Sequence, residues 1–407
     1  MRILHVIHGF PPHYMAGSEV YTHNLCRELA KANQVWVFSR MEDPYAPLYS
    51  TARDQVDGIE VTRMNKPPRD YTFRGKFVDE KADEVFDEYI SGIDPDIAHI
   101  GHLSHLSTNL VRMLKERGIP IVMTLHDFWL MCLRGQLLTS ELRVCDDPST
   151  EGCTRCFAQY FLSDKEAREK VSDWEQRVKE VVRNVDFYIA PSRFLRSRFV
   201  EWGIPGDKIA YMDYGFDTSL FRDFRRKESD VVRFGFTGRI IPAKGVDILI
   251  NAFNDVESDG TELRIHGALP PSSKYLARMV KSAKILFEGP YDNREVASVM
   301  SRIDVLVVPS IWFENSPLVI HEAFLTNTPV IASDIGGMAE YVDDGKNGLL
   351  FRVGDVDDLK EKITMLIEDS ALRERLSSGG GQVRTIQEDA SAILNIYERL
   401  TRQETAA

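Results

Sequence analysis

The chain has 407 residues, with 50 lysines and arginines against 62 aspartates and glutamates, which gives a formal net charge of −12. This length predicts two or three domains, each large enough to bury a core, and the acidic balance argues against bulk binding of nucleic acid. No stretch reaches the roughly 20 consecutive apolar residues of a transmembrane helix, and the first residues are typical of a strand rather than a signal peptide. We therefore expect a cytoplasmic protein.

Strand-like and helical segments alternate through the first half of the chain. It opens with a buried-looking strand, ILHVIHG, and a helix with an apolar stripe follows from Ser18 to about Lys31. Further strand-like runs occupy residues 34–39, 59–63, 97–100, 121–125 and 187–190. Helical patterns between most of these runs predict a doubly wound, parallel α/β sheet.

Two segments of the first half mix basic and aromatic residues. They are RMNKPPRDYTFRGKF, residues 63–77, and SRFLRSRFVEW, residues 192–202. Either could contact anionic lipid headgroups, which would make the protein peripheral at the inner face of a membrane. An ordinary solvated face over buried aromatics is the alternative, because charged patches are common on protein surfaces.

Histidines cluster after two of the predicted strands. His99, His102 and His105 are close in sequence, but the change from strand to helix between them would separate the rings, so contact with a substrate is the better functional interpretation than a metal site. His126 ends the apolar run IVMTL at the carboxyl end of a strand, where active-site groups collect in such sheets.

Four of the five cysteines follow, with the spacing C-x12-C-x7-C-x2-C. One C-x2-C pair with two more distant thiols is compatible with a tetrahedral structural zinc site. Free thiols remain open, and so does a disulfide or redox pair, although a reducing cytosol disfavours disulfides. None of these interpretations makes the cysteines catalytic. The four candidate zinc ligands are Cys132, Cys145, Cys153 and Cys156.

The boundary between the two halves is predicted within residues 213–230, where regular patterns give way to charge. Beyond it, strands are expected near Val231, Leu263, Ile285, Ile303, Val330 and Leu349, again with helical patterns between them. This repeated alternation predicts a second doubly wound sheet. A last helix, from about residue 385, has an apolar stripe that needs a partner surface.

The second half opens with a strand that runs into GRIIPAKG. Arg239 and Lys244 flank this crossover from strand to helix, where ligands bind in open α/β sheets. An arginine can hold a phosphate in a bidentate fork, and a lysine supplies a compact point charge. Together they could neutralise a diphosphate without a metal.

Two carboxylates lie in SIWFENSPLVIHEAF, after a strand predicted for IDVLVVPS. Glu314 falls in the loop that follows this strand. Ser316 is expected to cap the next helix, with Pro317 in its first turn and Glu322 on its second. The free N–H groups at this helix start would favour an anion.

These motifs resemble the retaining glycosyltransferases of family 4, which have the GT-B fold. The resemblance rests on G-R-x4-K-G and E-x7-E, here GRIIPAKG and Glu314 to Glu322, and it covers nearly the whole chain. Softer features agree in order and spacing, namely GFPPHYMAGSE, TLHDFW and SDIGGMAEYVDDGKNGLLF. One departure stands near the end of the first domain, where Tyr214-Gly215-Phe216-Asp217 replaces the Asn-Gly-Val-Asp turn of many relatives.

The resemblance implies a fold of two Rossmann-like, doubly wound parallel-sheet domains that face each other across a cleft. The acceptor-side domain would span residues 1–215, and the nucleotide-sugar donor domain residues 216–384. The helix at about 385–407 would pack back on the first domain.

The resemblance also implies roles for individual residues. Arg239 and Lys244 would bind the donor diphosphate, Glu314 the hydroxyls of the transferred sugar, and Glu322 the ribose. His126 would lie near the donor sugar, and Tyr291 is in a loop near the base. The phosphates would also face the loop that contains Gly17. Backbone N–H groups in the stretch formed by Asn315, Ser316, Pro317 and Leu318 would assist.

The expected reaction is transfer of a sugar, such as a hexosyl group, from a nucleoside diphosphate to a hydroxyl of a sugar or lipid-linked acceptor, with retention and without a catalytic metal. His126, Glu314, Arg239 and Lys244 would carry it. An epimerase of the same fold and a non-catalytic nucleotide-sugar sensor are alternatives. A dinucleotide-dependent oxidoreductase is disfavoured because neither half has G-x-G-x-x-G after its first strand.

Overall fold

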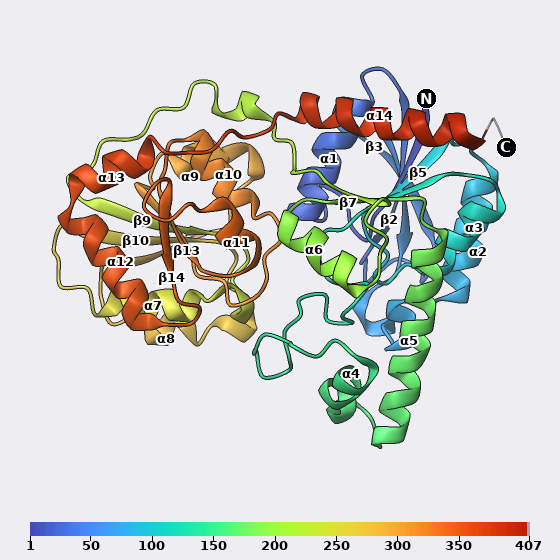
Figure 1. The fold of residues 1–407 in the computed structure, drawn as a ribbon, viewed down its shortest axis with the longest axis horizontal. Helices are drawn as coiled ribbons and strands as arrows, with labels where there is room; N and C mark the ends of the chain where they lie inside the picture. The colour runs from blue at the N-terminus through green and yellow to red at the C-terminus, as the bar shows by residue number, and fades with distance from the viewer. Residues whose placement is uncertain (405–407) are drawn as a thin grey trace. The chain divides into compact units, whose positions relative to one another are not determined.

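Each half of the chain builds its own sheet, and the computed structural model describes residues 1–404. Unit 1 consists of Met1–Gly135, Asp146–Phe216 and the chain from Arg384 onward, and unit 2 of Gln136–Cys145 and Asp217–Val383. Both units carry a mainly parallel sheet with helices on its faces (Figure 1). The prediction of two α/β sheets is confirmed.

The sheet of unit 1 has eight strands in the order β3-β4-β2-β1-β5-β6-β7-β8. Its central strands are short apolar runs that are buried along their length, as a strand covered by helices on both faces must be. All pairs are parallel except β3 with β4. The strands are β1 (Arg2–Val6), β2 (Gln34–Met41), β3 (Thr51–Val56), β4 (Ile59–Asn65), β5 (Ile97–Ile100), β6 (Ile121–Thr124), β7 (Phe187–Ala190) and β8 (Ile209–Tyr211).

Seven helices accompany this sheet among the described residues. Side-chain caps fix four of their starts, because Asp79, Ser149, Ser163 and Ser192 accept hydrogen bonds from free backbone N–H groups of the first turn. The helices are α1 (Gly17–Leu29), α2 (Glu80–Ser91), α3 (Asn109–Glu116), α4 (Thr150–Phe157), α5 (Asp164–Asn184), α6 (Arg193–Trp202) and α14 (Ile386–Glu404).

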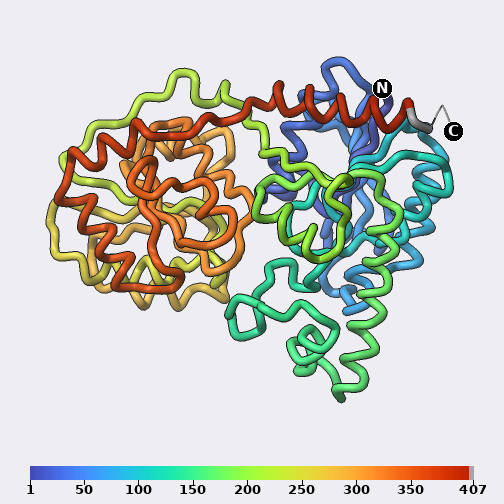
Figure 2. The backbone as a smooth tube through the Cα atoms, viewed as in Figure 1, coloured from blue at the N-terminus to red at the C-terminus, as the bar shows by residue number. Residues whose placement is uncertain are grey.

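The last helix, α14, lies along α1 (Figures 1 and 2). Its buried stripe includes Ile393 and Tyr397, which have no exposed surface. The chain passes from unit 1 to unit 2 and returns through two adjacent segments, since Phe216 N–H donates to Arg384 O at 2.9 Å and Ile386 N–H donates to Phe216 O at 2.8 Å. The predicted helix extended to 407, and residues 405–407 lie outside the described residues.

The sheet of unit 2 has six parallel strands in the order β11-β10-β9-β12-β13-β14. Two apolar clusters of unit 2 form its core, one around Phe234 and Leu249 and the other around Leu306 and Ile320. The strands are β9 (Val232–Thr237), β10 (Thr261–His266), β11 (Ile285–Gly289), β12 (Val305–Val308), β13 (Val330–Ser333) and β14 (Gly348–Phe351). The helices are α7 (Val246–Asn254), α8 (Leu276–Met279), α9 (Val296–Met300), α10 (Leu318–Leu325), α11 (Gly336–Tyr341), α12 (Val356–Glu368) and α13 (Ser370–Ser377).

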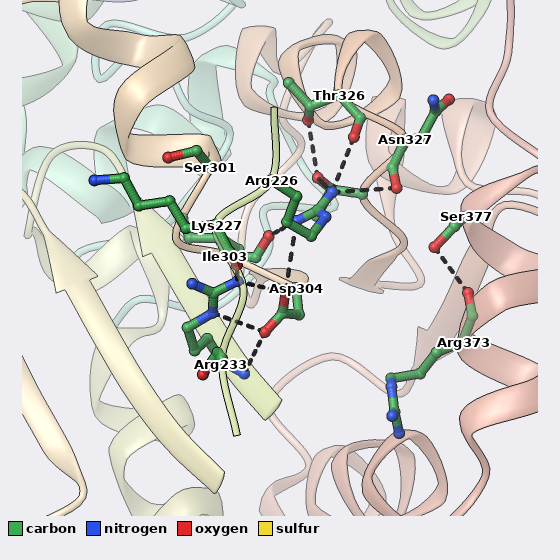
Figure 3. Close-up of polar contacts among 12 residues, drawn as sticks. Arg226, Lys227, Arg233, Ser301, Ile303, Asp304, Thr326, Asn327, Arg373 and Ser377 are labelled. Carbon is green, nitrogen blue, oxygen red and sulfur yellow. Dashed lines mark hydrogen bonds and ion pairs between the residues drawn. The ribbon is translucent and has the colours of Figure 1, made fainter. Parts of the chain in front are cut away.

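The charged segment that enters unit 2 is attached to it by two arginines (Figure 3). Arg233 of β9 donates to both carboxylate oxygens of Asp304, at 2.9 and 2.8 Å, and to the Lys227 carbonyl oxygen of the segment at 2.6 Å. Arg226 donates to the carbonyl oxygen of Thr326 at 2.9 Å and to the hydroxyl of Thr328 at 2.8 Å. The division between the two units, after Phe216, falls within residues 213–230, and residues 217–230 belong to unit 2.

Within residues 1–404, no helix combines the length and the apolar character that crossing a bilayer requires.

Candidate functional site

The loops after β9 and β12 are neighbours at the carboxyl edge of the unit 2 sheet. β9 pairs with β10 on one side and with β12 on the other. From β9 the chain adds β10 and β11 on one side of the sheet and then β12, β13 and β14 on the other, so the point between β9 and β12 is the topological switch point. Gly245 has a φ of 64°, and a Cβ there would stand 1.9 Å from the carbonyl oxygen of Pro309. Only glycine allows this approach, which brings Lys244 beside the loop that follows β12.

Lys244 and Glu314 form the centre of this site. The Lys244 Nζ atom lies 2.5 Å from Glu314 Oε1, the Ser310 hydroxyl donates to the same oxygen at 2.7 Å, and the Trp312 indole N–H donates at 2.9 Å. Lys244 Nζ also lies 5.9 Å from the centre of the Trp312 ring. Three donors thus hold a carboxylate that is only 6% exposed, so the cation and the carboxylate are fixed before any ligand arrives.

A pair of glycines supports the loop that carries Glu314. The Gly337 N–H donates to the Glu314 carbonyl oxygen at 2.8 Å. Gly336 has a φ of 58°, and a Cβ on Gly337 would lie 1.6 Å from the Asn315 carbonyl oxygen. The start of α11 can therefore approach this loop only because both residues lack a side chain.

We predict that Gly337→Ala displaces the loop of Glu314 and Asn315. The clash with a backbone carbonyl should destabilise unit 2 by roughly 1–3 kcal/mol, the usual range for overpacking, and should weaken binding of any ligand held by this loop. Thermal unfolding with and without ligand measures both effects. Gly260→Ala is the control, because the nearest atom to its Cβ would be 3.9 Å away. Wild-type stability of Gly337→Ala would contradict the prediction.

The helix that follows this loop starts one residue later than predicted. Pro317, with an extended backbone, occupies the N-cap position of α10, and no side chain caps the helix. The expected cap by Ser316 is therefore wrong, because Ser316 precedes the N-cap. Asn315 and Ser316 are buried beside the helix start. In the first turn, the Ile320 N–H donates to the Pro317 carbonyl oxygen at 3.0 Å, which leaves the N–H groups of Leu318 and Val319 without a partner within the helix.

Glu322 is a buried carboxylate on the second turn of α10. It is 8% exposed, and burial raises its pKa to about 7. Its Oε2 atom has no hydrogen-bond partner in the part of the chain that the structure describes. Tyr291, in the loop after β11, packs against the same apolar cluster as α10, and burial followed by the Glu322 charge raises the pKa of Tyr291. This carboxylate is suited to accept hydrogen bonds from ligand hydroxyls.

Arg239 follows Gly238 in the loop after β9 and is exposed. No side-chain hydrogen bond or ion pair joins it to another residue of the described chain. A guanidinium at this edge is free to bind an anion. The structure thus groups Lys244 with Glu314 and places Tyr291 beside Glu322, while Arg239 has no contact that fixes its orientation.

In unit 1, His126 lies just beyond the carboxyl end of β6. Its Nδ1 atom is 2.6 Å from the Tyr214 hydroxyl oxygen, and burial lowers its pKa to about 3, so the ring is neutral. Gly17 is exposed and is the first residue of α1, in the loop region after β1.

Two further histidines pair with acids at the same edge of this sheet. His8 lies 3.2 Å from Glu19, and His102 lies 3.3 Å from Asp127. The rings of His8 and His102 are 4.5 Å apart. The other two histidines of the 99–105 cluster have different partners, since His99 bonds Thr124 and Tyr397 and His105 stacks on Tyr71.

The predicted zinc ligands do not form a metal site. Among residues 1–404, no group of three or more histidine, cysteine or acidic side chains is arranged to hold a metal. Cys153 and Cys156 lie on α4, Cys132 lies in the loop after β6, and Cys145 belongs to the segment assigned to unit 2. Helix formation at Cys153 and Cys156 overrides the knuckle-like spacing.

Sequence patterns identified the charged residues of the site but missed several of their partners. Ser310, Trp312 and Gly337 act through contacts between loops, which no spacing records. Tyr214 had a signal, because it stands where the resembled turn has an asparagine.

Comparison with known proteins identifies similar chains. Residues 15–220, half of the chain, match the model described as Glycosyltransferase Family 4, and residues 217–383 match that of Glycosyl transferases group 1. An uncharacterised glycosyltransferase of Methanocaldococcus jannaschii is 35% identical over 41% of this chain and 48% of its own length. Glycogen synthase of Mycobacterium tuberculosis is 25% identical over 99% of this chain and 96% of its own.

Solved structures share the fold. The crystal structure of Anabaena HepE in complex with UDP and glucose superposes with a TM-score of 0.67 at 17% identity, covering 100% of both chains. At this identity the likeness concerns the fold alone.

Proposed function

Because this chain belongs to the group 1 glycosyltransferases of family 4 and has the GT-B fold, we propose that it transfers a sugar from a nucleoside-diphosphate sugar to an acceptor hydroxyl. The configuration at the anomeric carbon is retained. The acceptor is a sugar or a lipid-linked sugar, in the biosynthesis of a polysaccharide, glycolipid or other glycoconjugate.

The arrangement of Lys244, Glu314 and the start of α10 carries this proposal. Lys244 Nζ sits 2.5 Å from a carboxylate that Ser310 and Trp312 also hold, and the free N–H groups of α10 begin at Leu318, four residues after Glu314. A cation beside a helix start suits a diphosphate, and fixed carboxylates suit hydroxyls. A nucleotide sugar has both groups.

The names of relatives support the same donor class. HepE was crystallised with UDP and glucose, and a further full-length match is a glycogen synthase. For unit 1 we assign His126 and Gly17 the roles that the family resemblance implies, contact with the transferred sugar and with the phosphates.

The proposed chemistry uses positioning and charge stabilisation rather than a protein nucleophile. Retaining glycosidases place two carboxyl groups about 5 Å apart, one of them a free nucleophile, whereas Glu314 Oε1 is engaged by three donors. The acceptor oxygen forms the new bond on the face from which the diphosphate departs. The diphosphate takes the bonding electron pair and the acceptor proton, while Lys244 and Arg239 stabilise its charge.

A panel of UDP-, GDP-, dTDP- and ADP-sugars tests the proposal in two stages. Thermal unfolding in EDTA identifies the donor, since a ligand at 100 times its dissociation constant adds about 2.7 kcal/mol of stability. Proton NMR of the product formed with an acceptor then gives the anomeric configuration. We expect one base to stabilise the protein without metal and a product that retains configuration. An inverted product, or an altered donor sugar formed without acceptor, would overturn the assignment.

A further inference from the structure

A hydrogen-bonded link joins His126 to the two crossover segments of unit 1. These are the segment that leaves unit 1 at Phe216 and the segment that returns to it at Arg384. We propose that Tyr214 is a positioning residue that fixes the tautomer and orientation of the His126 imidazole, and that Tyr21 and Asp389 in turn hold Tyr214. The effect on turnover rests on the proposed function, because that function assigns His126 to the donor sugar. The effect on the tautomer and orientation of the imidazole is independent of the proposed function.

The contact between the two rings is close and buried. The Tyr214 hydroxyl oxygen is 2.6 Å from His126 Nδ1, and the ring planes are inclined by only 28°. Tyr214 is 5% exposed. A neutral imidazole has one N–H and one acceptor nitrogen. Since a phenol is the better donor of this pair, Tyr214 donates to Nδ1, and the imidazole proton stays on Nε2.

Tyr214 is itself held by a second tyrosine and by α14. The Tyr21 ring lies 4.2 Å from the Tyr214 ring, and the Tyr21 hydroxyl donates to Asp389 Oδ2 at 2.8 Å. The same oxygen accepts from the Gly215 N–H at 3.2 Å, and Arg384 Nη1 is 3.4 Å from Asp389 Oδ1. Asp389 has no exposed surface. One buried carboxylate therefore ties α1, the outgoing segment and the returning helix together around Tyr214.

The residue after Tyr214 must be glycine for this arrangement to form. A Cβ on Gly215 would lie 2.5 Å from the Cβ of Asp389 and 2.7 Å from the Thr385 carbonyl oxygen. The close approach of the two crossover segments therefore fixes the backbone at Tyr214, and with it the position of the hydroxyl.

A second chain of hydrogen bonds runs from α14 to the carboxyl end of β6. Tyr397 bonds His99 Nδ1 at 2.5 Å, and His99 Nε2 lies 2.7 Å from the Thr124 hydroxyl. Thr124 is the last residue of β6, two positions before His126. The segment that presents His126 is thus linked to α14 twice, once through His99 and Thr124 and once through Tyr214.

The test is Tyr214→Phe, which removes only the hydroxyl group. Nitrogen-15 NMR of labelled histidine distinguishes the two tautomers, and a His126→Asn variant assigns the signal. We expect a single Nε2–H tautomer in the wild type and a mixture in Tyr214→Phe. With an active donor and acceptor, kcat should fall about tenfold while KM for the donor changes less than twofold.

Two further variants separate positioning from general packing. Tyr188→Phe removes a buried hydroxyl of unit 1 that bonds the Val182 carbonyl oxygen at 3.4 Å, and it should leave both the tautomer and kcat unchanged. Tyr21→Phe keeps the bond between Tyr214 and His126 and should reduce kcat less than Tyr214→Phe does. A mixed tautomer in the wild type, or an unchanged tautomer in Tyr214→Phe, would overturn the inference even if no donor is ever turned over. If the tautomer shifts but transfer is absent with every donor, the proposed function fails instead.

Discussion

Replacing Lys244 with methionine is expected to lower kcat/KM for the donor by about 10²–10³-fold. Methionine keeps an apolar stem over the Trp312 ring but removes the charge that lies 2.5 Å from Glu314. Loss of one preorganised group that stabilises developing negative charge costs roughly 2–4 kcal/mol of barrier. Because the charge on a leaving diphosphate grows towards the transition state, most of the loss should be in kcat. Steady-state kinetics over a range of donor concentrations measures how the loss is divided between kcat and KM.

The control for this variant is Lys346→Ala. Lys346 is an exposed lysine of the same unit, paired with Asp343 at 2.8 Å, and its loss changes the net charge by the same amount. Arg239→Ala should resemble Lys244→Met in direction, since both cations are assigned to the diphosphate. Wild-type turnover by Lys244→Met would remove Lys244 from the mechanism, and equal losses in Lys346→Ala would reduce the effect to one of overall charge.

The positions of the charged residues in the candidate site were predictable because they follow from local pattern. Lys244 follows a buried strand and a glycine turn, and Glu314 follows another buried strand, so both had to emerge at the carboxyl edge of a parallel sheet. Their 2.5 Å contact depends on Gly245, whose left-handed backbone sits against Pro309. That approach connects two loops distant in sequence, and no single-sequence pattern records it.

The strands that escaped prediction lack the buried apolar character of the others. β3, TARDQV, is almost entirely exposed, and it pairs with β4 through a hairpin in which Asp57 and Gly58 have φ values of 48° and 82°. An Asp-Gly pair is a strong hairpin signal, but the exposed residues that precede it lack the apolar pattern of a buried parallel strand. β8 has only three residues, too few for any periodicity to be recognised.

The cysteine spacing shows where pattern reasoning fails for a different reason. C-x2-C resembles a zinc knuckle only if the two residues lie on a turn, and here α4 carries both Cys153 and Cys156. Ser149 caps that helix by accepting from the Gly152 N–H at 3.1 Å. The capping serine was visible in the sequence, and it favours a helix over a metal-binding turn.

Glu322→Gln is expected to change how the stability of unit 2 depends on pH. Burial raises the Glu322 pKa from an ordinary value of 4.5 to about 7, so the folded protein binds this proton more tightly than the unfolded chain does. Stability contributed by the protonated group is present below pH 4.5 and is lost as pH rises towards 7. The loss is about 3 kcal/mol at most. Glutamine cannot ionise, so Glu322→Gln should lack this decline.

Calorimetry of both proteins between pH 5 and 8 measures the effect. The melting temperature of wild-type unit 2 should fall relative to Glu322→Gln, by roughly 2–4 °C for each kcal/mol lost in a domain of this size. Tyr291 and His321 face the same carboxylate, and both are present in the two proteins, so the difference isolates Glu322. A difference in melting temperature between the two proteins that does not change with pH would contradict the raised pKa of Glu322.

The same carboxylate should make donor binding depend on pH in the opposite direction. Ribose hydroxyls donate hydrogen bonds to an ionised carboxylate, so binding selects the charged form of Glu322. Donor affinity should therefore rise up to tenfold for each pH unit below about 7 and level off above it. A nucleotide sugar has no terminal phosphate with a pKa near 6 to confuse the titration. Calorimetric titration of the donor should show this slope in the wild type and none in Glu322→Gln. A wild-type affinity that is flat from pH 5.5 to 8 would exclude Glu322 from the ribose site, because a buried carboxylate that binds hydroxyls must first lose its proton.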